Sequence, residues 1–151
     1  MKKRILIILA IVFSTMLSIA QTEDPNVGHR SIGLSYLENK MYGPAIKEFD
    51  LYLAKADVKY KYRIVTTYHL RAYCKYMLSD FNSAIEDYNV IILLCEKWSF
   101  ETTEEYSGAY YYKGMCEAIS GNNELGCSDL AIAVRLGHLK ASNLYINICN
   151  H

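Results

Sequence analysis

The sequence predicts an all-α protein in which three helical hairpins and a terminal helix form an array. Small residues recur twelve positions apart, and a bulky apolar or aromatic residue follows four positions later. This pattern occurs three times, at Gly33/Ala45/Phe49, Ala72/Ala84/Tyr88 and Gly114/Gly126/Leu130. The chain's two prolines, Pro25 and Pro44, lie ahead of the first expected helix and in the first turn of another. Proline is tolerated there because the first N–H groups of a helix have no partner within it.

The spacing indicates a helical hairpin for a simple physical reason. Twelve residues are enough for the chain to leave one helix, turn and enter an antiparallel second helix. Small side chains let the two backbones approach closely, and the bulky residue one turn later fills the seam between them. We therefore expect hairpins at residues 26–58, 65–98 and 107–137. A repeat at a nearly fixed period is the sequence signature of a helical solenoid.

These residues resemble the tetratricopeptide repeat (TPR) family. That family has a small residue at position 8 of its first helix, Ala at position 20 and an aromatic residue at position 24. The segment Ser79–Tyr88 is especially similar to a family member, and the resemblance covers about residues 26–137. It implies a right-handed superhelical array of the kind found in small exported bacterial members of the family.

The period departs from the family pattern. Equivalent residues are offset by 39 positions from Ala45 to Ala84 and by 42 from Ala84 to Gly126, whereas the family period is about 34. The additional residues fall near 57–61 and 95–103. We expect them to form lengthened helix ends or loops, which changes the superhelical angle and leaves the fold intact.

A terminal helix is predicted at residues 139–149, after the turn at Gly137 and His138. Such a helix covers the apolar seam that the last repeat of a solenoid would otherwise expose, although it could instead bind a partner. Cys127 opens the second helix of the third hairpin and Cys149 closes the terminal helix. Antiparallel packing would bring them together, so a disulfide is predicted if their Cα atoms lie within about 7 Å.

The N-terminus is typical of a signal peptide. Residues 2–4 are basic, residues 5–17 are uncharged and apolar, and small residues at Ser18 and Ala20 suit a signal peptidase. We expect cleavage after Ala20, leaving a TPR domain over residues 21–151 that is periplasmic or secreted and has no transmembrane span. The alternative is an uncleaved anchor, but residues 5–20 are shorter than the roughly 20 residues that a spanning helix needs.

Charge and motifs exclude several classes of function. Removing residues 1–20 takes away three of the 16 Lys and Arg residues and none of the 16 Asp and Glu residues. The remaining excess of acidic residues gives no reason to expect nucleic acid as a partner. The sequence has no glycine-rich phosphate loop, no Cys-x-x-Cys, no His-Glu-x-x-His and no Gly-x-Ser-x-Gly. We therefore expect no catalysis, no cofactor and no metal site.

The resemblance also implies which residues line the concave face. In the family, the second, fifth, ninth, twelfth and thirteenth positions of each repeat point inward. Transferred to this chain, these positions predict a partner-binding groove formed by Arg30, Leu34, Leu37, Glu38, His69, Tyr73, Tyr76, Met77, Tyr111, Met115, Ala118 and Ile119. Tyr and Met offer large, adaptable contact surfaces, so this lining suits an extended peptide or an amphipathic helix. The alternative is that several of these rings merely pack between helices.

The function expected from these observations is that of an exported protein–protein interaction module or scaffold. Repeat proteins that clamp the C-terminal carboxylate of a peptide place Lys and Asn at positions 5 and 9 of the first repeat. Here those positions hold Arg30 and Leu34, so a clamp of that kind is not expected. Two alternatives stay open: a structural or self-associating envelope protein, such as a homodimer, and a glycan-binding envelope component that uses exposed aromatic residues.

Overall fold

The computed structural model describes residues 24–149, and within them the chain is helical without any strand. The expected signal peptide, residues 1–20, lies outside the described residues. The helices follow in the order α2 (Val27–Glu38), α3 (Tyr42–Lys55), the short 3₁₀ helix η1 (Val58–Tyr60), α4 (Lys61–Met77), α5 (Phe81–Trp98), α6 (Glu104–Ile119), α7 (Asn123–Arg135) and α8 (Ala141–Cys149).

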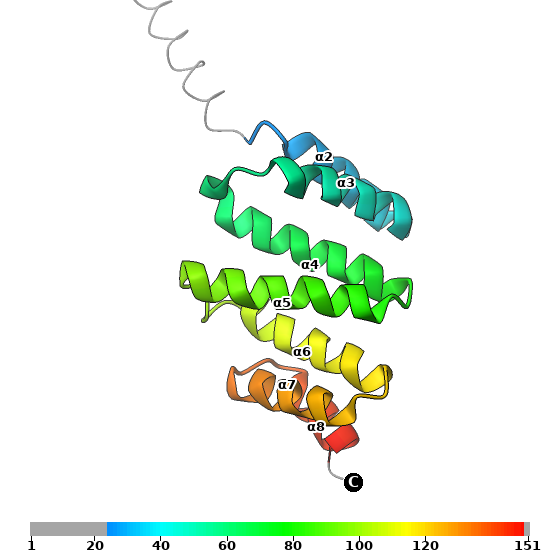
Figure 1. Cartoon of the computed structure of the whole chain (residues 1–151), viewed down its shortest axis with the longest axis vertical. Helices are drawn as coiled ribbons and strands as arrows, with labels where there is room; N and C mark the ends of the chain where they lie inside the picture. The colour runs from blue at the N-terminus through cyan, green and yellow to red at the C-terminus, as the bar shows by residue number, and fades with distance from the viewer. Residues whose placement is uncertain (1–23, 150–151) are drawn as a thin grey trace, which may run out of the picture.

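The helices stack one after another along the long axis of the molecule, so that α2 and α8 lie at opposite ends (Figure 1). Most of the packing joins helices that are consecutive in the chain. Helices α2/α3, α4/α5 and α6/α7 form the three hairpins, and α8 packs on α7. The predicted fold class, an all-α array of three hairpins with a terminal helix, is confirmed.

The small residues of the sequence pattern lie where paired helices approach most closely. A Cβ atom added to Gly114 would lie only 2.7 Å from the carbonyl oxygen of Gly126, and one added to Gly126 would meet the Gly114 oxygen at the same distance. In the first hairpin, a Cβ on Gly33 would lie 2.5 Å from the Phe49 ring. All nine residues of the pattern are buried: Gly33, Ala45, Phe49, Ala72, Ala84, Tyr88, Gly114, Gly126 and Leu130.

One turn geometry joins the two helices of each hairpin. The second residue after the first helix adopts a left-handed conformation at Lys40, Ser79 and Gly121, with φ of 58°, 61° and 87°. The next N–H then bonds back to a carbonyl five residues earlier, as from Asp80 to Lys75 at 3.0 Å. This arrangement satisfies carbonyl groups that the end of a helix would otherwise leave without partners.

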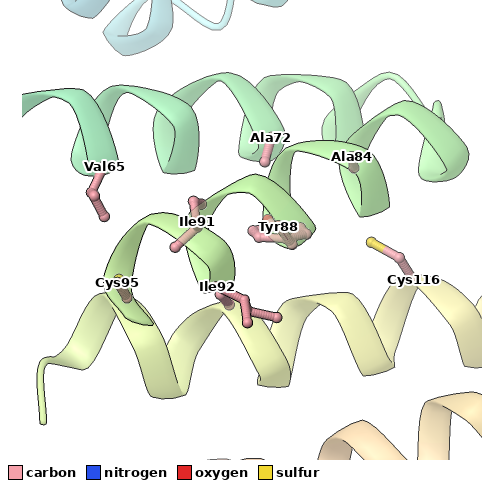
Figure 2. Close-up of a cluster of buried hydrophobic side chains, with 9 residues drawn as sticks. Val65, Ala72, Ala84, Tyr88, Ile91, Ile92, Cys95 and Cys116 are labelled. Carbon is pink, nitrogen blue, oxygen red and sulfur yellow. The ribbon is translucent and has the colours of Figure 1, made fainter. Parts of the chain in front are cut away.

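The main core lies at the centre of the array. Figure 2 shows α5 between α4 and α6, with Val65 and Ala72 contributed by α4 and Cys116 by α6. Helix α5 supplies most of the buried side chains of this cluster, including Tyr88 and Ile91. A smaller cluster of Ala45, Phe49 and Cys74 joins the first hairpin to α4.

Several helices begin at residues other than those expected. Helix α4 begins at Lys61 and α6 at Glu104, earlier than the expected repeat starts at residues 65 and 107. The added residues between the first two hairpins form η1, where Asp57 accepts a hydrogen bond from the Lys59 N–H at 2.9 Å. Helix α8 begins at Ala141 instead of residue 139, because Gly137 has a φ of 80° and the chain completes its turn before the helix starts.

Candidate partner-binding site

The first helices of all three hairpins surround a cavity of about 290 Å³. Helix α2 contributes Arg30 and Leu34, α4 contributes three residues, α6 contributes four, and the turn before α8 adds one. The complete lining is Arg30, Leu34, Thr66, His69, Leu70, Glu104, Glu105, Gly108, Tyr112 and His138. We call this the central pocket.

Three of the residues expected in the groove, Arg30, Leu34 and His69, line the central pocket. The tyrosines of α4 have other surroundings. Tyr73 packs edge-to-face on Tyr42 of the preceding hairpin, with ring centroids 6.5 Å apart. Tyr76 packs on Phe81 at 5.7 Å, and its hydroxyl lies 4.0 Å from the sulfur of Met115. These rings take part in packing between helices.

The remaining expected groove residues also lie outside the lining of the central pocket. The ring of Tyr111 stacks on the imidazole of His138, with centroids 4.3 Å apart. Glu38 and Met77 lie exposed at the ends of α2 and α4, and Ile119 lies exposed at the end of α6. The central pocket therefore has a mixed lining of charged, imidazole, aromatic and aliphatic groups, and the wider groove expected from the repeat positions stays a prediction.

The sequence reasoning missed seven residues of the central pocket. Thr66 and Gly108 occupy the second position of their repeats, so the family's inward positions carried a signal for both. Leu70 and Tyr112 follow an inward position by one residue. Glu104, Glu105 and His138 come from the early start of α6 and from the turn before α8. No repeat position predicts these last three, because they belong to the segments in which the chain departs from the family period.

Two imidazoles flank Tyr112 in this pocket. The ring of His69 contacts Tyr112 at a centroid distance of 5.4 Å, and His138 contacts it at 6.5 Å. The Nδ1 atoms of both histidines are buried and find no hydrogen-bond partner among the residues described. Burial lowers the pKa of both histidines, and the nearby Glu104 carboxylate partly opposes that effect. Both rings are therefore neutral groups at pH 7 that can bond to a ligand.

A second cavity, of about 570 Å³, adjoins the central pocket and shares Arg30 and Thr66 with it. Its lining is rich in cations and aromatic rings: Arg30, Lys59, Tyr60, Lys61, Tyr62, Arg63, Thr66 and Phe100. We call this the basic pocket. It is formed largely by η1 and the start of α4, the segment that lengthens the repeat. The two pockets give the concave face a basic region beside a region that contains Glu104 and Glu105.

The two cysteines expected to pair lie together at the end of the array. Cys127 is in the first half of α7 and Cys149 is the last residue of α8. Their Cα atoms are 5.7 Å apart and their sulfur atoms are at disulfide-bond distance. Cys74, Cys95 and Cys116 are unpaired and buried.

Within residues 24–149, no group of three or more His, Cys, Asp and Glu side chains is arranged to hold a metal ion. In that range, no helix combines the length and apolar character needed to cross a bilayer.

Comparison with families and curated proteins gives no match to any family model or curated protein. Solved structures do match. The TPR2AB domain of yeast Sti1 in complex with pHSP90 is 12% identical with a TM-score of 0.68, covering 82% of this chain and 45% of that chain. This chain thus spans less than half of that relative's length.

Two further structures are matched over most of their length. The Arabidopsis OM64 TPR domain is 17% identical with a TM-score of 0.65, covering 83% of this chain and 95% of that one. The first TPR of Spaghetti (RPAP3), bound to the HSP90 peptide SRMEEVD, is 19% identical with a TM-score of 0.65, covering 83% of this chain and 90% of that one. At these identities the likeness shows the fold alone: the chain has the tetratricopeptide repeat fold.

Proposed function

We propose that this chain is an exported interaction module that holds an extended peptide segment of another protein on its concave face. The observation that carries the proposal is the central pocket, to which the first helices of all three hairpins contribute. A ligand in this position contacts the first helix of every hairpin. Two of the structures with the same fold are complexes with pHSP90 and with an HSP90 peptide, which supports a peptide as the type of ligand.

The shape of the concave face favours an extended chain over a small molecule. The central and basic pockets share Arg30 and Thr66, so one segment can occupy both. Hydroxyl, imidazole and guanidinium groups lie along this path and can bond to the backbone of a peptide. Directional polar groups of this kind fix the register of a ligand, while the flanking rings supply contact area.

Export is proposed from the N-terminal pattern and is supported by the cysteine pair. Disulfides persist in oxidising compartments and are rare in the cytosol, and Cys127 and Cys149 are placed at bonding distance. Mass spectrometry of the protein purified from its host tests both points. We expect a mature chain that begins at Gln21 and has one disulfide; an intact Met1 together with five thiols would contradict export.

Selection from a peptide library tests the binding function. Peptides selected against residues 21–151 should lose affinity by about tenfold or more for a variant in which the central pocket is filled, such as Gly108→Leu, because Gly108 lines that pocket. Gly43→Leu, in α3, is the matched control, because a Cβ added there meets nothing within 4 Å. Equal binding to both variants would place the ligand elsewhere, and the absence of any selected binder would contradict the proposal.

Self-association is a second candidate, favoured by one observation at the end of the array. Leu139, just before the terminal helix, is 96% exposed, and Ile146, within that helix, is 55% exposed. Two such ends could bury these side chains against each other. Light scattering coupled to size exclusion distinguishes the candidates, because a monomer at micromolar concentration contradicts self-association and leaves peptide binding unaffected.

A further inference from the structure

The partly buried cations of this protein show a consistent pairing with carboxylates. Arg71 donates to Asp87 at 2.6 and 2.9 Å and to Asp50 at 2.5 Å. Lys75 lies 2.9 Å from Asp87, and Lys113 lies 2.9 Å from Asp129. Such pairing is expected, because removing a charge from water costs several kcal/mol unless an opposite charge compensates it.

Arg30 departs from this rule. Its guanidinium is half-buried, and its Nε donates to Thr67 Oγ1 at 3.0 Å while a terminal nitrogen donates to Thr66 Oγ1 at 3.4 Å. Both hydroxyls in turn donate to the Arg63 carbonyl oxygen, which orients them to accept from Arg30. Among residues 24–149, no carboxylate lies within ion-pair distance of Arg30. The guanidinium is therefore held in place by neutral groups.

The Asp24 carboxylate, which acts on the charge of Arg30, already has other partners. Asp24 is buried, accepts a hydrogen bond from the Tyr52 hydroxyl at 2.7 Å and lies 3.5 Å from Arg63. Tyr52 and Asp24 favour the charged form of Arg30, while Arg63 disfavours it. One buried carboxylate thus serves two guanidinium groups, and burial lowers the pKa of Arg30, which indicates incomplete compensation of its charge.

The surroundings of Arg30 add more positive charge on one side. No Asp or Glu lines the basic pocket. The ammonium of Lys61 lies over the ring of Trp98, 5.8 Å from its centroid, and Lys59 lies 3.7 Å from the exposed Asp57. On the other side of Arg30, the central pocket contains Glu104 and Glu105. The site is thus cationic toward η1 and acidic toward the start of α6.

Arg30 also lies between the two pockets instead of at an end of either one. Because both linings include Arg30 and Thr66, a chain that passes from one pocket to the other runs past this guanidinium. The guanidinium of Arg30 therefore meets a side chain in the interior of the bound segment. A guanidinium fork donates two parallel hydrogen bonds to a carboxylate, which makes Arg a strong and directional carboxylate ligand.

We propose that Arg30 recognises the carboxylate of an internal Asp or Glu in an extended peptide, so that the binding face selects acidic segments and reads them in one direction. Further acidic residues lie toward Lys59 and Lys61, and uncharged or basic residues lie toward Glu104 and Glu105. The inference rests on the proposed function, since it specifies the chemistry of the peptide that the concave face holds. It assigns no role to the free C-terminus of the peptide.

The test is a selection of twelve-residue peptides displayed within a loop, so that none has a free C-terminus, against the wild-type chain 21–151 and against Arg30→Gln. We expect Asp and Glu to be enriched at one internal position of the wild-type binders and this enrichment to be lost with Arg30→Gln. Binders without such enrichment overturn the inference and leave the proposed function standing. If no peptide is selected at all, the proposed function fails, and the inference fails with it.

The selected peptides are then synthesised with acetylated and amidated ends and measured by fluorescence anisotropy. We expect at least about a tenfold loss of affinity when the enriched acidic residue is changed to Asn or Gln or when Arg30 is changed to Gln. Lys47→Gln removes the same charge from an exposed site on α3 that lines neither pocket, so it should bind like the wild type. Equal binding to Arg30→Gln overturns the inference.

Two further measurements distinguish recognition of an internal carboxylate from recognition of a terminal one and from a loss of folding. Lys61→Gln leaves the Arg30 contacts in place and should weaken binding by a few fold, which keeps the inference testable if circular dichroism shows that Arg30→Gln is unfolded. Unchanged binding to a folded Lys61→Gln would then overturn it. The same peptides with a free C-terminal carboxylate should bind no more tightly than the amides. A gain of about tenfold would assign Arg30 to a terminal carboxylate instead.

Discussion

At the scale of single residues, the three hairpins share an acidic group that pairs with the first helix. It is Glu48 against His29 in the first hairpin, at 2.8 Å, and Asp87 and Asp129 at the equivalent positions of the second and third. Asp87 faces two cations, whereas Asp129 faces Lys113 and a second carboxyl group, Glu117. The third hairpin thus holds two carboxyl groups around one cation.

The contribution of these groups to the free energy of unfolding depends on pH. Glu117 is 5% exposed and lies 3.7 Å from Lys113. Burial, together with the neighbouring Asp129 carboxyl group, raises the pKa of Glu117 to about 7 from an ordinary value of 4.5. The folded chain therefore binds a proton more tightly than the unfolded chain does. Glu117 consequently lowers the free energy of unfolding as pH rises from about 4.5 to about 7, and the loss persists above that.

We predict that Glu117→Gln is more stable than the wild type at pH 8 by about 1–2 kcal/mol, and that this advantage shrinks toward pH 4.5. Glutamine keeps a hydrogen-bond donor for Asp129 and removes the charge. Urea unfolding between pH 4.5 and 8.5 measures the difference. Glu86→Gln, at an exposed position on α5, should follow the wild-type curve. Parallel curves for Glu117→Gln and the wild type would contradict the prediction.

The crossing of α6 and α7 gives a second prediction at this scale. Gly114→Ala would place a methyl group 2.7 Å from the Gly126 carbonyl oxygen, so the helices must separate. We expect a loss of about 2 kcal/mol or more in the free energy of unfolding. Gly28→Ala meets nothing within 4 Å and should be neutral or slightly stabilising, because Ala restricts the unfolded chain. Thermal unfolding measures both variants. Equal shifts of their unfolding midpoints would contradict this prediction.

At the scale of elements, one covalent contact joins the terminal helix α8 to α7. Ala141 is its buried residue, and its other described side chains are exposed or partly so. Helix α8 packs on α7, where Cys149 meets Cys127. A short helix with so little burial gains little from packing. We therefore expect the disulfide between Cys127 and Cys149 to hold it in place.

We predict that Cys127→Ser combined with Cys149→Ser lowers the free energy of unfolding by about 2–4 kcal/mol and detaches α8. Hydrogen exchange should become fast in residues 141–149 while α4–α6 stay protected. Reductant added to the wild type should reproduce this pattern and should have no effect on the double variant. Full protection of α8 in the double variant would show that packing alone holds the helix.

At the scale of the whole molecule, stability is concentrated in the middle of the array. Helix α5 carries six buried residues and packs between α4 and α6 (Figure 2), whereas Gly33 is the buried residue of α2. In a solenoid each element contacts mainly its neighbours, so the ends have fewer partners and open first.

We therefore predict a gradient of amide exchange along the array. The N–H groups of α5 should exchange most slowly, those of α4 and α6 at intermediate rates, and those of α2 and α8 fastest. Hydrogen exchange followed by mass spectrometry on wild-type residues 21–151 measures this order. Uniform protection from α2 to α8 would mean that the array unfolds only as a single unit.

The sequence determined the hairpins because their seams obey a local geometric rule. Two helices can cross at the distance seen between Gly114 and Gly126 only if neither residue has a side chain there, and such small residues are visible in the sequence at constant spacing. The pairing of Cys127 with Cys149 was foreseeable for a related reason, since antiparallel neighbours bring the start of one helix beside the end of the next.

Only the tertiary structure decided what the concave face is made of. Tyr73, Tyr76 and Tyr111 lie at or near inward positions, yet each finds another ring to pack against. The two pockets also include residues from segments where the period is irregular, such as Glu104 and Lys61. A repeat predicts where its regular positions lie, because helical geometry is local. It cannot predict a surface formed by irregular segments, because the course of those segments depends on packing between hairpins.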